Sequence, residues 1–252
     1  MSAGQVRLIP VPGIPTVQPA DDLAALIVRS LPEGLQQGDV LVVAQKIVSR
    51  AEGRLVRLAD VHPSARAQDM ARTANKDPAL MELILRESNE VLRVHEGVVI
   101  VEQRSGWVCA NAGIDRSNVP PGTGAVAALL PLDADASARR LADGLHKLTG
   151  QTVAVIINDS HGRAWREGST GVAIGIAGMR AIKDERGQRD LFGYQLQTSV
   201  IGLADEIASA ASLLMGQTDE GIPAVVVRGL TYDRAEGTAG ELIRPKERDL
   251  FR

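Results

Sequence analysis

The chain has 252 residues, of which 28 are basic and 31 acidic, so its formal net charge at pH 7 is −3. Hydrophobic residues make up 44% and charged residues 23%, a balance typical of a globular protein, and the aromatic share of 2% predicts an aliphatic, alanine-rich core. The length allows one large domain or two smaller ones. Because no basic block or aromatic-interleaved stripe occurs, we expect no nucleic-acid partner.

The cysteine content and the N-terminal residues exclude further kinds of protein. Cys109 is the only cysteine, which excludes an internal disulfide and a cysteine-cluster metal site, and its apolar neighbours predict a buried, inert thiol. The first five residues lack the basic and apolar regions of a signal peptide. The uncharged stretches at 125–132 and 171–179 are too short to cross a bilayer. We therefore expect a cytoplasmic protein with no membrane partner.

Hydrophobic periodicity and turn residues predict an alternation of strands and helices along the chain. In chain order the predicted elements are a strand over 6–11, a helix from an Asp21-Asp22 cap to Arg29, a buried strand over 40–43, a helix starting at Pro63-Ser64, a helix from Asp77 with a stripe reaching Leu92, a hairpin of 98–101 with 107–110, an apolar run over 125–130, a helix from Asp135 or Ser137 to Thr149-Gly150, a buried strand over 153–157, a glycine-thinned strand over 172–178, a helix over 200–215 and a strand over 223–228.

The stretch from Val153 to Arg163 is the first place where chemistry is expected. Its apolar run passes into Asp159, Ser160 and His161, so Asp159 is predicted to lie where a buried strand meets solvent. A carboxylate and a hydroxyl before an arginine suit a divalent cation and an anionic ligand. The same residue types cap ordinary turns, which remains an alternative, and His161 is expected to be solvent-exposed and neutral.

A second acidic loop follows the predicted hairpin. Asp115 comes shortly after a strand, and Asn118 lies three residues further on. An Asx turn would account for this pair equally well. The repetition of a strand followed by an acidic, glycine-bearing loop at Asp115 and Asp159 favours chemistry, because two carboxylates brought together could hold one metal ion that bridges phosphate oxygens.

Other polar segments carry weaker signals. Gln45, Lys46 and Arg50 follow the strand over 40–43 and either face phosphate or form a solvated edge. Together with Arg163 and Arg166, the two cations among them are the side chains expected to hold phosphates. The loop over 216–221 is bounded by glycines but lacks the lysine and hydroxyl residue of a Walker A sequence, and the mixed charges over 180–190 indicate a solvated surface.

Several short motifs occur together in a fixed order. They are Gly38-Asp39-Val40-Leu41-Val42-Val43, Ser49-Arg50-Ala51-Glu52-Gly53-Arg54, Asn111-Ala112-Gly113-Ile114-Asp115-x-Ser117-Asn118, Ile156-Ile157-x-Asp159-Ser160-x-Gly162-Arg163, Ala204-Asp205-Glu206-Ile207-Ala208, Leu213-Leu214-Met215-Gly216 and Gly221-Ile222-Pro223-Ala224-Val225-Val226-Val227-Arg228-Gly229. In this order they closely resemble the coenzyme F420-0:L-glutamate ligase family, over about residues 8–230.

The resemblance implies a fold and an activity. Members of that family have an α+β fold of mixed sheets with packed helices, arranged in two lobes and assembled as an intertwined homodimer. They use GTP with Mn²⁺ or Mg²⁺, are helped by K⁺, and add γ-linked L-glutamate to coenzyme F420-0. We accordingly expect residues 1–230 to form the ligase domain and residues 231–252 to form a charged, partly mobile C-terminal tail.

The resemblance also assigns roles to residues of this chain. Asp115 and Asp159 match the ligands of a first metal ion and are the expected catalytic carboxylates, and Ser160 and Gln217 match ligands of a second. The nucleotide contacts that it implies are Ile14, Pro15, Thr16, Val17, Gln45, Lys46, Arg50, Asn118, Met215, Gly216, Gln217, Thr218, Asp219, Glu220, Gly221 and Ile222. This chain departs from the family at Gln45-Lys46, where relatives carry small hydroxyl residues.

The implied chemistry is phosphorylation of the terminal carboxylate of F420-0 followed by attack of the glutamate amine on the acyl phosphate. Two alternatives stay open. A metal-dependent phosphohydrolase or small-molecule kinase would use the same acidic loops without glutamate, and a noncatalytic nucleotide-binding protein would retain GTP binding without either aspartate. The presence of both Asp115 and Asp159 argues against the noncatalytic alternative.

Overall fold

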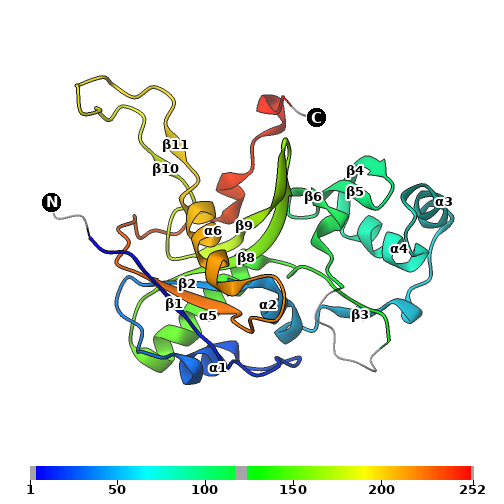
Figure 1. Cartoon of the computed structure of the whole chain (residues 1–252), viewed down its shortest axis with the longest axis horizontal. Helices are drawn as coiled ribbons and strands as arrows, with labels where there is room; N and C mark the ends of the chain where they lie inside the picture. Colours follow the sequence, from blue (N-terminus) through cyan, green and yellow to red (C-terminus); the bar gives the residue numbers. More distant parts are fainter. Residues whose placement is uncertain (1–3, 117–123, 251–252) are drawn as a thin grey trace.

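A computed structural model describes residues 4–116 and 124–250 of the chain. Within this described part, the largest sheet has five strands (Figure 1). In spatial order they are β1 (Arg7–Pro10), β12 (Ala224–Arg228), β2 (Val40–Ala44), β8 (Ala154–Arg163) and β9 (Arg166–Ala177). β2 and β8 are parallel, and the other neighbouring pairs are antiparallel.

Helices cover both faces of this sheet. They are α1 (Leu23–Ser30) and α5 (Ala134–Thr149) on one face and α6 (Leu203–Met215) on the other. In β2, Leu41 and Val43 belong to the core under α1 and α5, while Val40 and Val42 belong to the core under α6. The alternation confirms the prediction that the strand over 40–43 is buried on both faces, as β8 is over residues 154–157.

A further core cluster lies outside the large sheet. Its elements are α3 (Ala65–Ala74), α4 (Pro78–Arg86) and a three-stranded antiparallel sheet of β4 (Ser88–His95), β5 (Val98–Gln103) and β6 (Val108–Ala110). Met81, Ile84, Val99 and Val101 are completely buried here. The antiparallel pairing of β5 with β6 confirms the predicted hairpin. The architecture is therefore a mixed α+β one with several sheets.

Short elements connect these parts. They are α2 (Gln45–Ala51), the two-stranded pair β3 (Leu55–Arg57) and β7 (Val126–Ala128), and the 3-10 turns η1 (Leu58–Asp60) and η2 (Asn111–Gly113). β10 (Lys183–Asp184) and β11 (Val200–Ile201) form the base of an extended arm that projects from the main body (Figure 1).

Several predicted helix starts are confirmed by their capping hydrogen bonds. Asp22, Ser64 and Asp77 are the N-caps of α1, α3 and α4, and each side chain accepts a hydrogen bond from a backbone N–H of the first turn. The cap of α5 was predicted wrongly, because Asp133 accepts the bond from Ala136 N. The Asp135 carboxylate instead accepts bonds from two backbone N–H groups outside its own helix.

Two predicted helix boundaries are also wrong. The helix starting at Asp77 ends at Arg86, and Leu92 belongs to β4, where pairing with β5 outweighs the helical spacing. The helix predicted over 200–215 starts at Leu203, because Val200 pairs with β10 in the arm. In both cases an apolar residue at helical spacing lies on a neighbouring strand.

Close packing of glycine and alanine brings helices onto β9, as predicted. A Cβ added at Gly175 would collide with Ala134 at the start of α5, and one added at Gly171 would collide with Ala208 and Ser212 of α6. Ala204, Ala208 and Ala211 of α6 are completely buried. The small side chains therefore set the short distance between helix and sheet.

Residues after β12 return to the main core. The 3-10 turns η3 (Ala239–Leu242) and η4 (Lys246–Arg248) lie here, and Thr238 with Glu241 forms a capping box at η3. Ala239 is 1% exposed and belongs to the core under α6. Among the described residues, no helix combines the length and apolarity needed to cross a membrane.

A buried ion pair joins β12 to the start of β2. Arg228 donates from Nε to Asp39 Oδ1 at 2.9 Å and from Nη2 to Asp39 Oδ2 at 2.7 Å. Both residues are buried, at 8% and 2% exposure, and Glu33 accepts from Arg228 Nη1 at 2.6 Å. The bidentate geometry holds the two strands side by side at the end of the sheet opposite the site described below.

Replacing Arg228 by methionine is expected to lower the free energy of unfolding by about 3 to 5 kcal/mol, because Asp39 would remain buried without its partner. Urea denaturation measures this loss. The matched control is Arg7→Met, which removes an exposed partner of Glu33 and should cost about 1 kcal/mol or less. Equal losses in the two variants would contradict the role assigned to the buried pair.

Candidate functional site

Four segments far apart in sequence meet at one end of the strands of the five-stranded sheet, the end at which β2 finishes. The parallel pairing of β2 with β8 has Ala44 opposite Asn158, so the residues that follow them emerge side by side. β12 is antiparallel to β2 and starts at Ala224, which puts the preceding loop at the same end. β1 ends at Pro10, opposite the start of β12, and its following loop arrives there too. The carboxyl ends of neighbouring parallel strands are a common place for ligand sites.

These segments enclose a cavity of about 420 Å³, a volume suited to a small-molecule ligand. The residues lining it are Ile14, Pro15, Thr16 and Val17 after β1, Ala44, Gln45, Lys46, Ile47 and Arg50 from β2 and α2, Asn158, Asp159 and Ser160 from β8, and Met215, Gly216, Gln217, Thr218, Asp219, Glu220, Gly221, Ile222 and Pro223 between α6 and β12.

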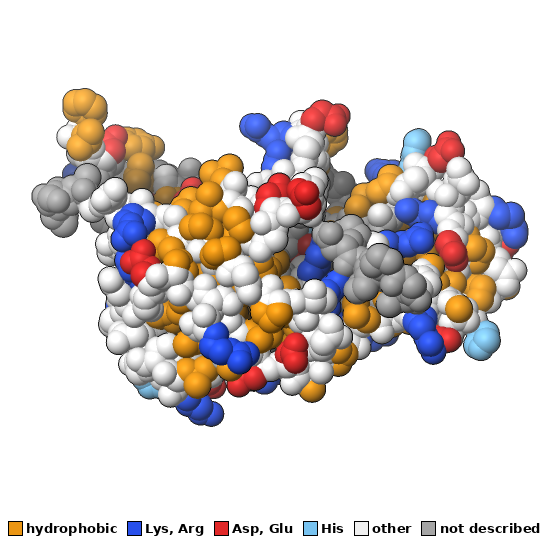
Figure 2. Space-filling model, turned by 60° about the horizontal axis from the view of Figure 1, so that its bottom comes forward, with side chains coloured by type: hydrophobic (Ala, Val, Ile, Leu, Met, Phe, Trp, Pro, Cys, Tyr) orange, Lys and Arg blue, Asp and Glu red, His pale blue; other side chains and the backbone are white. Residues whose placement is uncertain are grey.

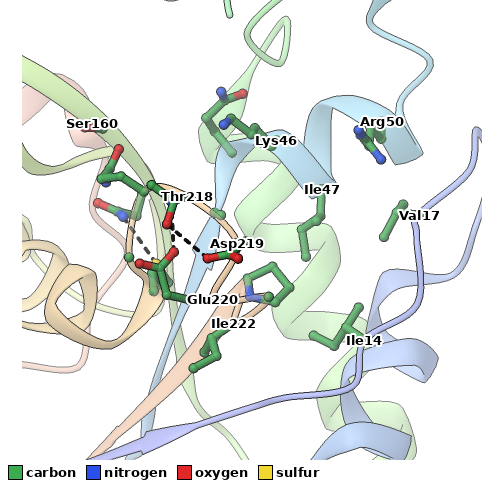
Figure 3. Close-up of a pocket in the computed structure, with 18 of the residues that line it drawn as sticks. Ile14, Val17, Lys46, Ile47, Arg50, Ser160, Thr218, Asp219, Glu220 and Ile222 are labelled. Carbon is green, nitrogen blue, oxygen red and sulfur yellow. Dashed lines mark hydrogen bonds between the residues drawn. The ribbon is translucent and has the colours of Figure 1, made fainter. Parts of the chain in front are cut away.

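The two sides of the cavity differ in chemistry (Figure 3). Ile14, Val17 and Ile47 lie on one side and offer an apolar surface. Ser160 and Glu220 lie on the other side, where they offer oxygen atoms. A ligand with a flat apolar part and a polar part would match this division.

α2 supplies the basic groups of the cavity. Lys46 and Arg50 stand one helical turn apart and both line it. Gln45 is 2% exposed, and its Oε1 accepts a hydrogen bond from Ser49 Oγ at 3.0 Å. The burial of Gln45 and the cavity contact of both cations favour a role in the cavity over a solvated edge. The helical conformation was not predicted from the sequence.

Asp159 lies within β8, which continues to Arg163 as a hairpin with β9 instead of ending at the carboxylate. The side chains do become more exposed from Asp159 onward, as predicted. His161 lies two residues on, hence on the same face of the strand, and donates from Nε2 to Asp159 Oδ2 at 2.9 Å. The His161 side chain is only 13% exposed, so the prediction of a solvent-exposed histidine is wrong.

An irregularity in the β8–β9 pairing lies beside Asp159. Ile157 pairs with Gly175 and Asn158 with Ala173, so β9 carries one extra residue at this level. The backbone N–H of Ala173 donates to Asp205 Oδ1 of α6 at 2.8 Å. Burial raises the pKa of Asp205, and the Ala173 bond opposes that shift. Asp205, which the sequence motif contained without a role, thus stabilises the bulge next to the site.

Asp115 reaches the site from the other core cluster. A turn with positive φ at Asn111, Ala112 and Gly113 directs the chain away from β6, and Asn111 Oδ1 accepts from Val99 N at 3.2 Å. Lys46 Nζ then lies 2.8 Å from Asp115 Oδ2. Asp115 is thus connected to the cavity through Lys46, which lines it.

The loop after α6 is closed on itself by short polar contacts. Gly216 has a φ of +65°, and a Cβ there would collide with the Glu220 carboxyl group. Glu220 Oε2 accepts from Thr218 N at 2.8 Å, and Thr218 Oγ1 donates to Asp219 Oδ1 at 3.2 Å (Figure 3). The loop therefore presents Gln217 and Asp219 to the cavity from a defined turn.

Oxygen donors dominate the polar side of the cavity. Asp159, Ser160 and Gln217 offer a carboxylate, a hydroxyl and an amide oxygen, the ligand types that Mg²⁺ and Mn²⁺ prefer. Within the ranges that the structure describes, no group of three or more His, Cys, Asp or Glu residues forms a metal cage. The donor set suits a hard cation that completes its coordination with water and ligand oxygens.

Comparison with known proteins shows the family to which this chain belongs. The sequence model described as F420-0:Gamma-glutamyl ligase matches residues 13–229. The chain belongs to this family. The match covers all four segments that line the cavity and both expected carboxylates.

Three similar proteins are named coenzyme F420:L-glutamate ligase. The protein of Methanothermobacter thermautotrophicus is 48% identical over 98% of this chain and 99% of its own length. That of Methanopyrus kandleri is 48% identical over 98% of both chains. That of Archaeoglobus fulgidus is 45% identical over 98% of this chain and 97% of its own. The likeness therefore extends over nearly the full length of each protein.

Residues assigned through the family resemblance gather at this cavity. The residues of the loop after β1, of α2 and of the loop over 215–222 that were expected to contact a nucleotide all line it, as do Asp159 and Ser160. Asn118 lies outside the described residues. Arg163 and Arg166, expected to hold phosphates, lie at the exposed tip of the β8–β9 hairpin, away from the lining.

Four lining residues were not predicted: Ala44, Ile47, Asn158 and Pro223. Ile47 carried no polar signal, although its place three residues before Arg50 on a helix would have indicated it. Asn158 donates from Nδ2 to Ser212 Oγ at 3.0 Å and is 7% exposed. Its position directly before Asp159 was the sequence feature from which its place in the site could have been predicted.

Cys109 is expected to react slowly in the native protein. Burial, followed by the charge of Asp159, raises the pKa of Cys109 to about 12. At pH 8 this leaves on the order of a thousandfold less thiolate than an ordinary cysteine has. Labelling with a chromogenic disulfide should therefore be far slower in the folded chain than in urea. Asp159→Asn should speed it, whereas Asp143→Asn on α5 should not; equal native and unfolded rates would contradict this.

Proposed function

We propose that this chain is a GTP-dependent ligase that joins L-glutamate through a γ-glutamyl amide bond to coenzyme F420-0. Family membership supports the ligase class and these two substrates. The observation that carries the finer proposal is the single cavity in which an apolar wall, two cations and an oxygen donor set face one another.

A nucleoside triphosphate matches the two sides of this cavity. The base would lie against the apolar side formed by Ile14, Val17 and Ile47. Lys46 and Arg50 would then bind phosphate oxygens, since ammonium and guanidinium groups both bind phosphate strongly. The loop over 215–222 would cover the nucleotide with backbone N–H groups and the Gln217 side chain.

Asp115, Asp159, Ser160 and Gln217 would hold the divalent cations, Mn²⁺ or Mg²⁺, with K⁺ as a further activator. The cations would neutralise charge on the phosphates and on the carboxylate acceptor. His161 orients the Asp159 carboxylate, and Lys46 orients that of Asp115. Both carboxylates are thereby held in place before any ligand arrives.

The proposed reaction has two steps. A carboxylate oxygen of F420-0 attacks the γ-phosphorus of GTP, the bond to the β–γ bridging oxygen breaks, and GDP leaves an acyl phosphate behind. The amine of L-glutamate then attacks the acyl carbon, loses a proton, and inorganic phosphate departs. Positioning and charge neutralisation account for most of the rate enhancement in such transfers.

Incubation of the purified chain with GTP, Mn²⁺, L-glutamate and F420-0 tests the proposal. Product masses should increase by glutamyl units, and GDP should appear in equal amount to amide bonds formed. GTP turnover that continues undiminished without glutamate and F420-0 would favour a phosphohydrolase, and GTP binding without turnover would favour a noncatalytic role.

Asp159→Asn is expected to lower kcat by a factor on the order of a hundred or more, because one charged oxygen ligand at the reacting phosphates is lost. The fold should persist, as judged by circular dichroism and the melting temperature. Asp143→Asn, the same substitution at an exposed position of α5, is the matched control. Near-full ligase activity of Asp159→Asn would refute the assigned role.

We further propose that the chain forms the two-lobed, intertwined homodimer that the family resemblance implies. Leu191 and Phe192 at the end of the arm are 96% and 95% exposed. Figure 2 shows hydrophobic side chains at the end of this projecting arm. Asp190 Oδ1 accepts from Phe192 N at 2.9 Å and from Tyr194 N at 2.8 Å, so the tip is an ordered turn. Exposed apolar anchors on an ordered turn suit a protein interface.

The double substitution Leu191→Ser with Phe192→Ser is expected to weaken the dimer by about tenfold or more, because about 1.4 kcal/mol of apolar burial suffices for that change. Light scattering after size exclusion over a concentration series measures the dissociation constant. Leu132→Ser, at a 70% exposed site away from the arm, should leave it unchanged. A monomeric wild-type chain would contradict the proposal.

A further inference from the structure

The turn at the end of the β8–β9 hairpin presents an exposed tryptophan. β2 pairs with β8 only as far as Asn158, and β8 and β9 then continue as a two-stranded hairpin (Figure 1). Ala164 and Trp165 connect the two strands, and Trp165 is 85% exposed. A packed aromatic side chain buries about 150 to 250 Å², so its exposure here gives up a large stabilisation. The turn therefore offers a flat apolar surface to solvent.

The backbone of Trp165 has a conformation that tryptophan disfavours. Its φ is +66°, in the left-handed region, where the Cβ atom of an ordinary residue is crowded. Glycine or asparagine is the usual choice at such a position of a turn. The stability of the turn does not explain a tryptophan at this position. Backbone strain of this kind is often found where a side chain binds a ligand.

Two arginines flank the turn and lie beside each other. Arg163 and Arg166 are direct partners in the pairing of β8 with β9, so their side chains leave the same face of the hairpin. Arg163 Nη2 donates to the carbonyl oxygen of Glu167 at 3.4 Å. In the part of the chain that the structure describes, neither arginine forms an ion pair with a carboxylate. Neighbouring guanidinium groups repel each other, and a bound phosphate would offset that repulsion.

β8 connects this turn to the cavity. Asp159 lines the cavity, and Arg163 lies four residues further along the same strand. Alternation puts both on one face of the strand, with His161 between them. At about 3.3 Å per residue the two positions are roughly 13 Å apart. The turn therefore lies one extended small molecule away from the proposed reaction centre.

The acceptor of the proposed reaction has a matching length and chemistry. F420-0 carries a flat deazaflavin ring at one end and the reacting carboxylate at the other, with a sugar-alcohol chain and a phosphodiester between them. About ten single bonds separate the ring from the carboxylate, which is roughly 12 Å for an extended chain. L-glutamate has no ring, and the base of GTP already has the apolar side of the cavity.

We propose that the turn of the β8–β9 hairpin binds the ring end of F420-0. The deazaflavin ring stacks on Trp165, Arg163 and Arg166 bind the phosphodiester, and the terminal carboxylate reaches the cavity beside Asp159. This inference rests on the proposed ligase function. Indole and deazaflavin are both flat aromatic systems, and guanidinium groups bind phosphate through paired hydrogen bonds.

The test is calorimetric titration of F420-0 into Trp165→Gly and into the double variant Arg163→Gln with Arg166→Gln, with and without GDP and Mn²⁺. Trp165→Gly should raise the Kd for F420-0 by about tenfold, the loss typical of removing one stacked ring. The double variant should raise it by about tenfold or more, because hydrogen bonds to a charged group are lost. Arg139→Gln, at an exposed position of α5, is the matched control and should leave the Kd unchanged.

Three further readouts separate binding from folding. The melting temperature of Trp165→Gly should not fall, because glycine accepts the positive φ. Trp165→Phe keeps a ring and should retain most of the affinity. The deazaflavin riboside that lacks the phospholactyl group should bind more weakly to Trp165→Gly than to the wild type, but equally well to the wild type and to the arginine double variant. In steady-state assays the KM for GTP should not change in any of these variants.

An unchanged Kd for F420-0 in Trp165→Gly, or an equal effect of Arg139→Gln, would overturn the proposal. Absence of F420-0 binding to the wild type under both conditions would overturn it as well. Failure of the ligase function is distinguishable, because the titration needs no turnover. A wild-type chain that forms no amide, yet binds F420-0 more tightly than Trp165→Gly does, would refute the proposed reaction and support the binding site.

Discussion

The parallel pairing of β2 with β8 is the constraint on which the rest of the site depends. Both strands are buried on both faces, so a slip of one residue would move apolar side chains between two cores and is strongly disfavoured. This register keeps Gln45 and Asp159 at one end of the sheet. Because β12 and β1 continue the same sheet, their loops are held at that end too. The cavity is thus formed by short loops on a rigid frame.

Basic partners hold both acidic residues of the proposed centre. Asp159 accepts a bond from His161, and Asp115 pairs with Lys46. A divalent cation arriving with the nucleotide would compete with those partners for the same carboxylate oxygens. The Lys46 ammonium could then turn to the phosphates, since it lies on the lining of the same cavity. The charge arrangement is therefore suited to exchange partners when ligands bind.

Much of the fold could be predicted from local patterns, and the errors have a common cause. Strands with apolar residues on both faces and caps such as Ser64 and Asp77 have strong local signals. Leu92 and Val200 have helical spacing to their neighbours, yet each belongs to a strand. Val200 pairs with Asp184 of β10, and Leu92 lies at an irregularity between Val91 and Arg93, which both pair with β5. His161 was expected in solvent, since nothing in a linear sequence reveals that its strand continues into a hairpin.

The sequence by itself determined the family, the oxygen-bearing and cationic residue types of the site, and the strands that carry them, because these depend on residue identity and short spacing. Only the tertiary structure decided which groups meet. Lys46 reaches Asp115 across 69 positions of sequence, by subtraction of their residue numbers, and Asn158 reaches Ser212 across 54. Contacts between residues so far apart in sequence follow from sheet register and from the packing of separate core clusters. No local sequence pattern encodes either of these.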